Sequence, residues 1–267
     1  MMARDNIAHD NVDPALAELE KERTLGGLGA TKIREVPRID LSDFEARKSE
    51  IADQLWQAST DIGFFQIVNH GIPQEQIDEA FAMTERFFAL PHEIKAQYPL
   101  GKGTNAGWEY KSQVRPSTGT PDQKESYQIT LPRMAKLWPT GNELPGFKAA
   151  MLAFQRANWA LGMKVLSCFA LKLGFTPDFF TECHDPLSSE YQSTLRLLHY
   201  LPMTDAKPED FTGWRAGAHT DFDCSRSCIN ARVRAAFNSV REKSRPSSLG
   251  PTSSRCPESS PAILATC

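Results

Sequence analysis

The chain has 267 residues, of which 40% are hydrophobic and 24% charged, and its net charge at pH 7 is −3. These values are ordinary for a soluble globular protein with one large domain or two small ones, and the small charge gives no argument for nucleic acid or a membrane as a partner. The charged N-terminus has no secretory signal pattern, and no apolar run is long enough to span a bilayer. We therefore expect a cytoplasmic protein whose six cysteines are reduced thiols.

The first part of the chain predicts alternating helices and strands. An aspartate followed by Pro14 is typical of a helix start, and we interpret residues 1–34 as an arm that packs on the domain. A proline-containing edge strand is expected over residues 36–41, and the spacing of apolar residues predicts an amphipathic helix over 44–60. The apolar run 63–68 predicts a buried strand closed by a turn.

The middle of the chain predicts two further helices around a loop-rich segment. After Pro73, four apolar residues at helical spacing mark the second amphipathic helix. Residues 101–132 are rich in Gly, Pro, Ser and Thr, as loops around the mouth of a site often are, but residues 124–130 alternate as a strand does. Apolar residues then mark one face of a long helix over 147–173, with a glycine after its end. The four apolar residues after Pro73 are Ile77, Phe81, Phe87 and Phe88.

Residues 193–202 predict one more strand, in which His199 and Tyr200 point to opposite faces. Either side chain is a candidate to line a pocket. The ordinary expectation for His199 is a half-buried histidine whose ring nitrogens are satisfied. His70 stands where a strand passes into a turn, and there a hydrogen-bonding role is more common than metal binding.

A histidine and an aspartate stand two residues apart at His219 and Asp221. In an extended segment both side chains project to the same face, with Thr220 facing the other way. An imidazole and a carboxylate suit Fe(II), Mn(II) or Zn(II), and non-haem iron oxygenases combine this pair with one more histidine. Alone, the pattern is common by chance, and it then marks a surface histidine near a turn. No histidine follows His219 in the sequence.

Taken together, the residues resemble the Fe(II)/2-oxoglutarate-dependent dioxygenase superfamily, in its branch with isopenicillin N synthase and the plant and fungal hydroxylases. The resemblance covers residues 35 to about 224, and its patches follow one another in the family's order. The second patch is far more specific than the His-x-Asp pattern. The patches are residues 36–41, 61–73, 87–91 with Glu93 and Lys95, and 195–202 leading to His219 and Asp221.

The resemblance implies an α+β fold in which a helical N-terminal region precedes a jelly roll, the double-stranded β-helix. It implies Fe(II) as the metal, with His219 and Asp221 as two of its ligands, and 2-oxoglutarate as the cosubstrate, with Tyr200 seating its carboxylate. Three protein ligands on one face of an octahedron leave three positions for the cosubstrate and O2. The implied reaction is the oxidation of a small organic molecule, such as a secondary metabolite.

The chain departs from the family after Cys224. The resemblance requires a distal histidine on a later strand and then an Arg-x-Ser that grips 2-oxoglutarate. Arg245 begins an Arg-x-Ser, but in the sequence it follows Asp221 by only 24 residues, too few for the family's order, and no strand pattern surrounds it. Residues 225–267 include ten Ser, six Arg and four Pro, a composition typical of disordered sequence. Our hypothesis is a shifted reading frame or retained intron, which predicts an impaired or inactive oxygenase. A natural short isoform, or a non-catalytic remnant or binding protein, is the alternative.

Two zinc interpretations compete with iron. Cys224 and Cys228 form a C-x3-C pattern without two further ligands nearby, and a zinc hydrolase built on His219 and Asp221 would lack a third ligand and a general base.

These observations predict a partial jelly roll in four segments. They are an arm over residues 1–34, an N-terminal dioxygenase region over 35–132, a long helix with the first strands of the core over 133–224, and the atypical tail over 225–267.

Overall fold

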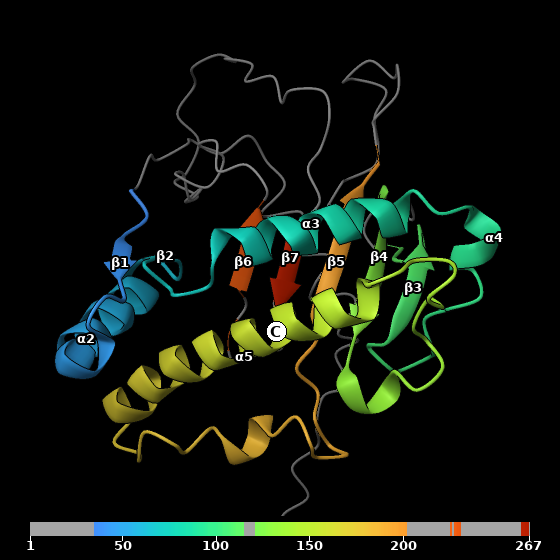
Figure 1. Cartoon of the computed structure of the whole chain (residues 1–267). Helices are drawn as coiled ribbons and strands as arrows, with labels where there is room; N and C mark the ends of the chain where they lie inside the picture. The colour runs from blue at the N-terminus through green and yellow to red at the C-terminus, as the bar shows by residue number, and fades with distance from the viewer. Residues whose placement is uncertain (1–34, 115–120, 202–224, 226, 231–262, 267) are drawn as a thin grey trace, which may run out of the picture.

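The computed structural model describes residues 35–114, 121–201, 225, 227–230 and 263–266 (Figure 1). This part of the chain contains helices and two β-sheets, one with two strands and one with five. The helices are α2 (Phe44–Asp61), α3 (Gln74–Phe88), α4 (His92–Lys95) and α5 (Phe147–Lys172), with 3-10 turns at Leu131–Arg133 and Glu182–His184.

The small sheet pairs β1 (Arg38–Asp40) with β2 (Gln66–Val68) in parallel. Parallel strands need a crossover, and α2 supplies it, with its apolar stripe buried as the spacing predicted. The prediction of a buried strand over residues 63–68 was wrong about burial, since β2 is half-buried and Phe64 is 58% exposed. Both strands of a two-stranded sheet are edges, so an apolar run there is only partly covered.

The helices α3 and α5 contribute a large part of the hydrophobic core, and both were predicted. The centroid of the Phe87 ring on α3 lies 4.4 Å from that of Tyr127 and 5.3 Å from that of Phe147 on α5. Gly174 follows α5 with a φ of 81°, a left-handed conformation that glycine adopts without steric cost. All four apolar residues that predicted α3 are buried, namely Ile77, Phe81, Phe87 and Phe88.

The larger sheet is antiparallel throughout, and its strand order is β3-β4-β5-β7-β6. The strands predicted over 124–130 and 193–202 are its centre, β4 and β5. Its members are β3 (Gly107–Tyr110), β4 (Lys124–Ile129), β5 (Leu195–Tyr200), β6 (Ser227–Asn230) and β7 (Ile263–Thr266).

Two of these strands fall in the tail, residues 225–267, where the composition predicts disorder. β7 pairs with β5 on one side and with β6 on the other, so the expectation of disorder does not hold for these two strands. The physical reason is local. The edge of β5 that β4 does not occupy offers backbone groups for pairing, and the β-favouring Ile263 and Thr266 stand in the short segment that pairs with it.

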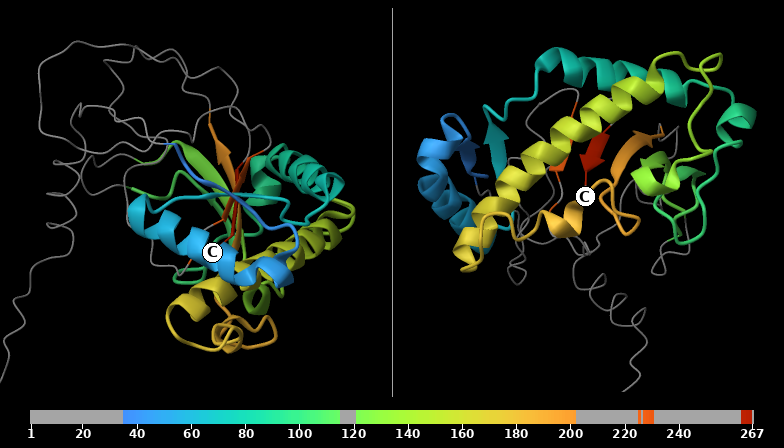
Figure 2. Two further views of the ribbon diagram at one scale, coloured as in Figure 1. Left: turned by 90° about the vertical axis from the view of Figure 1, so that its left-hand side faces the viewer. Right: turned by 60° about the horizontal axis from the view of Figure 1, so that its bottom comes forward.

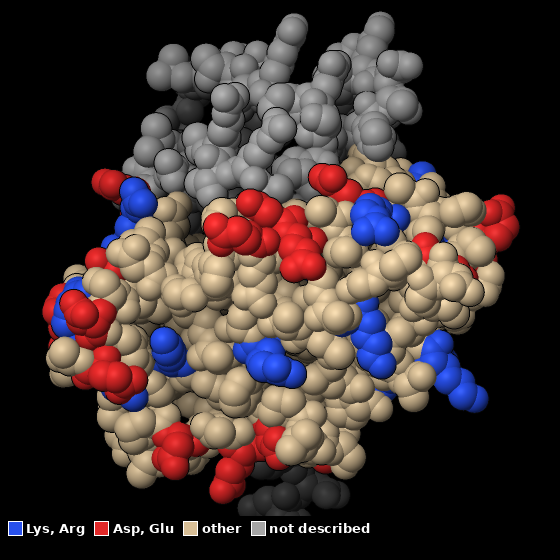
Figure 3. Space-filling view, viewed as in Figure 1, with Lys and Arg blue, Asp and Glu red and all other residues tan. Residues whose placement is uncertain are grey.

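The helices α3 and α5 cover one side of the larger sheet, and α5 crosses it obliquely (Figure 2). Charged side chains stay on their outer surfaces, where acidic residues gather over α3 and basic residues lie along α5 (Figure 3). The exposed acidic residues of α3 are Glu75, Asp78, Glu79 and Glu85, beside one exposed basic residue, Arg86, and the exposed basic residues of α5 are Lys148, Arg156, Lys164 and Lys172.

One hydrophobic core joins residues from Ile39 to Leu197, on both sides of the boundary predicted at 132/133. Within the described residues the antiparallel strands form a single sheet, so the second sheet of a jelly roll stays a prediction. No helix in the described ranges has both the length and the hydropathy that a membrane span needs.

Candidate active site on the polar face of the sheet

The strands β3, β4 and β5 present two chemically different faces. Residues directly opposite one another across a sheet point to the same side, so the register sorts their side chains. Tyr127 is aligned with Trp108 and Leu197, and its contact with Phe87 identifies the side that faces the helices. The opposite side, here called the polar face, carries Glu109, Lys124, Ser126, Gln128, Arg196, Leu198 and Tyr200.

All six residues of β4 are buried. The alternation that predicted this strand therefore separates two buried environments and does not separate core from solvent.

Glu109 is the centre of a hydrogen-bond network on the polar face. It is only 9% exposed, and its Oε1 accepts hydrogen bonds from Ser126 Oγ at 2.6 Å, Gln113 Nε2 at 3.0 Å and Gln128 Nε2 at 3.2 Å. Arg196 Nη2 donates to Gln128 Oε1 at 2.8 Å, which joins β5 to the network. A buried carboxylate is costly unless it is hydrogen-bonded, and uncharged donors meet that need here.

Tyr200 lies at the end of the polar face, half-buried and directly opposite Lys124 on β4. The Lys124 ammonium forms an ion pair with Asp122 Oδ2 at 3.2 Å. Burial lowers the pKa of Lys124, and the negative charge of Asp122 opposes that shift without cancelling it. The tyrosine that the resemblance assigns to 2-oxoglutarate is thus on the side of the sheet that turns away from the helices.

The two predicted metal ligands, His219 and Asp221, lie outside the described residues, as do Cys224 and Arg245. In the ranges that the structure describes, no group of three His, Cys, Asp or Glu residues is arranged to hold a metal ion. The iron ligands therefore stay predictions from the sequence.

A second buried carboxylate, Glu125, faces the helices. Its Oε2 accepts hydrogen bonds from Lys95 Nζ at 2.9 Å and Trp108 Nε1 at 2.8 Å, and its Oε1 lies 2.9 Å from His199 Nδ1. Burial alone raises the pKa of Glu125, but the hydrogen bonds from His199, Lys95 and Trp108 outweigh it and hold the pKa below its ordinary value. Lys95 also donates to the Phe88 carbonyl at 2.8 Å, so this cluster ties α3 and α4 to the sheet.

The sequence did not reveal the Glu125 cluster, although one signal was present. Lys124 and Glu125 are adjacent charges in an alternating strand, so whichever face is buried must receive one of them. Lys95 belongs to a patch of the resemblance but carried no assigned role.

Two histidines, His70 and His199, were predicted to form hydrogen bonds, and His70 not to bind a metal. His70 Nδ1 accepts a hydrogen bond from the Ile72 backbone N–H at 3.1 Å, as expected for a turn. His199 has a 34% exposed side chain, and its Nδ1 is paired with Glu125, which confirms a half-buried histidine with one ring nitrogen satisfied. Because it faces the helices, His199 is not a residue of the polar face.

Comparisons with known proteins agree with one another. Residues 36–141 match the family described as non-haem dioxygenase in morphine synthesis, N-terminal. The chain is 32% identical to proline hydroxylase buaE of Petromyces alliaceus over 203 residues. That alignment covers 70% of this chain and 62% of buaE. The chain is 30% identical over 208 residues to the 2-oxoglutarate-dependent dioxygenase caaD of Aspergillus niger, covering 72% of this chain and 62% of that protein.

A solved structure has a similar fold. It is the crystal structure of a full-length Neurospora crassa protein in complex with alpha-KG and thymine, with a TM-score of 0.62 and 24% identity over 86% of this chain and 72% of that chain. The chain spans 62% of the length of each of the two fungal relatives above.

Proposed function

Because the chain belongs to the non-haem Fe(II)/2-oxoglutarate-dependent oxygenase superfamily, we propose that it contributes a site where O2, with Fe(II) and 2-oxoglutarate, oxidises a small organic molecule. Fe(II) and 2-oxoglutarate are the metal and the cosubstrate of this superfamily. The small size of the substrate is supported by similar proteins whose descriptions refer to proline and thymine.

The observation that carries the proposal is the orientation of β5. This strand precedes His219 and Asp221 in the sequence, and its register sends Tyr200 to the polar face and His199 to the helices. A cosubstrate with two carboxylates needs polar partners, and the polar face supplies hydroxyl, amide and charged groups. On the helix side, aromatic rings predominate and the Lys95 and His199 donors are already paired with Glu125.

The donor set fits the metal in part. His219 and Asp221 would bind Fe(II) through an imidazole nitrogen and a carboxylate oxygen, a combination that iron accepts. The Tyr200 hydroxyl would donate a hydrogen bond to a carboxylate of 2-oxoglutarate. When bound, iron and its cosubstrate would activate O2, which supplies the oxidising power, while the protein's own residues hold and orient the reactants and exclude water from them.

For the chain as printed we propose weak iron binding and slow turnover. No histidine follows His219 to complete the ligand set, and metal affinity falls steeply when a ligand is absent. The same observation favours a second candidate, a non-catalytic remnant or binding protein.

An anaerobic titration tests the proposal. The full chain is mixed with Fe(II) and 2-oxoglutarate, and we expect a weak visible charge-transfer band, followed by succinate release when air is admitted. His219→Ala and Asp221→Ala should each abolish the band. His92→Ala is the matched control, because His92 is exposed on α4 and should leave the band unchanged. A chain that gives no His219-dependent band and no succinate would instead support the non-catalytic candidate.

A further inference from the structure

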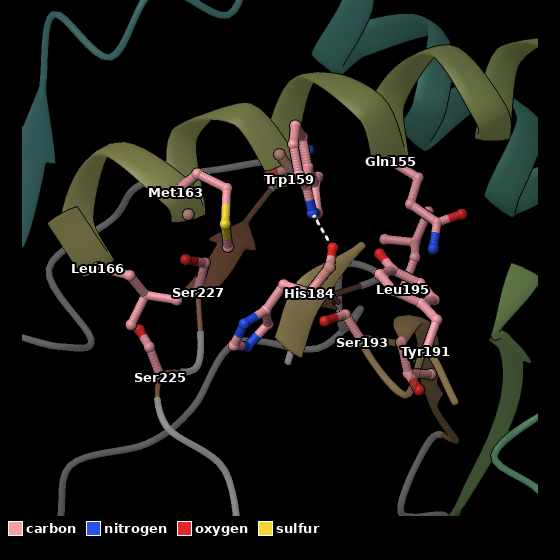
Figure 4. Close-up of a pocket in the computed structure, with 13 residues that line it drawn as sticks. Gln155, Trp159, Met163, Leu166, His184, Tyr191, Ser193, Leu195, Ser225 and Ser227 are labelled. Atoms are coloured by element: carbon pink, nitrogen blue, oxygen red, sulfur yellow. Dashed lines mark hydrogen bonds between the residues drawn. The ribbon is translucent and has the colours of Figure 1, made fainter. Parts of the chain in front are cut away.

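A cavity of about 60 Å³ lies between α5 and the segment that leads into β5 (Figure 4). Its volume is several times the roughly 10–15 Å³ that one water molecule needs. None of the described residues that line it carries a carboxylate, an ammonium or a guanidinium group. The polar part of its lining includes Gln155, Asn158, Trp159, His184, Tyr191 and Ser193.

Two buried amides that line this cavity have unpaired oxygens. Gln155 and Asn158 are 5% and 4% exposed, and their Oε1 and Oδ1 atoms have no hydrogen-bond partner within the described part of the chain. Their orientation is determined by the nitrogens, since Gln155 Nε2 donates to the Ile129 carbonyl at 3.3 Å and Asn158 Nδ2 to the Phe154 carbonyl at 2.8 Å. If either amide were flipped, its side-chain oxygen would face the backbone carbonyl oxygen that its nitrogen now contacts. The unpaired atoms Gln155 Oε1 and Asn158 Oδ1 are therefore hydrogen-bond acceptors. An unpaired buried acceptor is costly, which makes a donor at this position favourable.

The remaining polar groups also favour a neutral ligand that donates hydrogen bonds. His184 Nδ1 lies 2.7 Å from the Phe180 carbonyl and must carry a hydrogen there, so the neutral ring has Nε2 as an acceptor. Trp159 Nε1 already donates to the His184 carbonyl at 2.7 Å. Burial raises the pKa of Tyr191 against opposing hydrogen bonds from Ser193 and Gln155, so its hydroxyl stays uncharged. Without an anionic group, the cavity offers no counter-charge to a cation.

Gly162 accounts for the space. It lies inside α5 and lines the cavity, yet a Cβ added there would have no heavy atom within 4 Å, so close packing does not require a glycine. Glycine in a helix interior is destabilising relative to alanine. Its absent side chain leaves room beside apolar wall residues, including Met163 and Leu166.

We propose that this cavity binds a small neutral molecule with an N–H donor group at one end and a short apolar group at the other, the chemistry of a primary alkylamide. The donor group would meet Gln155 Oε1 and Asn158 Oδ1, and the apolar group would occupy the space beside Gly162.

The site is separate from the candidate active site. Leu195, which lines the cavity, begins β5 and Tyr200 ends it, a separation of about 17 Å along an extended strand. The Leu195 side chain also points to the face opposite Tyr200. The proposal therefore does not depend on iron or on 2-oxoglutarate.

Ligand-observed NMR on the full chain tests the proposal with propionamide as the probe. Its near-isostere 2-butanone, which has a methyl group in place of the NH2, is the chemical control. We expect propionamide to bind and 2-butanone to bind at least about tenfold more weakly, the change expected when a hydrogen bond to the ligand is lost. Equal signals from the two compounds, or no binding of propionamide, would overturn the proposal.

Two variants connect binding to the cavity. Gly162→Leu should fill the space and Asn158→Leu should remove an acceptor, each reducing propionamide affinity about tenfold or more. Ala160→Leu places the same leucine side chain on the exposed side of α5 and should leave binding unchanged. Circular dichroism checks that each variant is folded, and Gly162→Leu decides the question if Asn158→Leu does not fold. Undiminished binding to Gly162→Leu, or a crystal soaked in propionamide that holds only ordered water in the cavity, would contradict the proposal.

Discussion

Glu109 and Glu125 are buried carboxylates on opposite faces of one sheet, and their partners differ in kind. Glu125 faces the helices and is paired with the Lys95 ammonium and the His199 ring. Glu109 belongs to the polar face and accepts hydrogen bonds from uncharged hydroxyl and amide groups, such as Ser126 Oγ. A charged pair that crosses between layers ties helix to sheet, whereas neutral donors keep a face polar without such a tie. The helix side therefore serves the architecture, and the polar face is left for chemistry.

The largest expected effect is the loss of the Glu125 carboxylate. Glu125→Ala leaves the Lys95 ammonium buried without its counter-charge, and we expect the free energy of unfolding to fall by about 3–5 kcal/mol. Urea denaturation at pH 7 measures the change. A loss below about 1 kcal/mol would mean that the cluster does not connect helix and sheet energetically.

The comparison becomes sharper when both glutamates are replaced by glutamine. In Glu125→Gln the new NH2 group faces one of the donors that now bind the carboxylate, such as Lys95 Nζ or Trp108 Nε1. We expect the free energy of unfolding to fall by about 2–3 kcal/mol. Glu109→Gln keeps one oxygen for its amide and hydroxyl donors, and Ser112 Oγ can turn to accept from the new NH2 group, so the expected loss is at most about 1 kcal/mol. Equal losses in the two variants would refute the distinction between the faces.

The pH dependence of stability offers a smaller effect with a definite sign. The pKa of Glu125 is lower in the folded protein than its ordinary 4.5, so the unfolded chain binds more protons as the pH falls. Its contribution is complete above pH 4.5 and is lost as the pH falls through the lower folded value. Urea denaturation between pH 7 and acid should therefore show a shallower decline for Glu125→Gln than for the unsubstituted chain. A decline of unchanged steepness would show that this carboxyl does not contribute.

The smallest expected change in stability comes from substitution of Tyr200. Substitution of its neighbour His199 should lower stability but leave cosubstrate binding unchanged. Tyr200→Phe should alter the free energy of unfolding by less than about 1 kcal/mol but, if the proposed function holds, weaken 2-oxoglutarate binding about tenfold. His199→Leu removes a partner of Glu125 and should lower stability while sparing cosubstrate affinity. Calorimetric titration of 2-oxoglutarate and urea denaturation separate the two effects, and a reversed pattern would contradict the assignment of faces.

Local patterns predicted much of the secondary structure. The apolar spacing of α2, α3 and α5 was sufficient because each helix buries one stripe against the same core. The tail was harder to predict, since β7 is defined by its pairing with β5, a partner more than sixty residues away. The composition of a segment contains no information about a strand elsewhere in the chain with which it can pair.

The sequence by itself determined the order of helices and strands, the likeness to iron oxygenases, and the pairing of His219 with Asp221 as a motif. It also showed that His199 and Tyr200 point to opposite sides of a strand, because that follows from the period of an extended chain. Only the tertiary structure decided which side faces the helices, and with it the burial of both faces of β4. Alternation labels two faces as different, but what each face touches depends on elements distant in the sequence, and no local pattern contains that information.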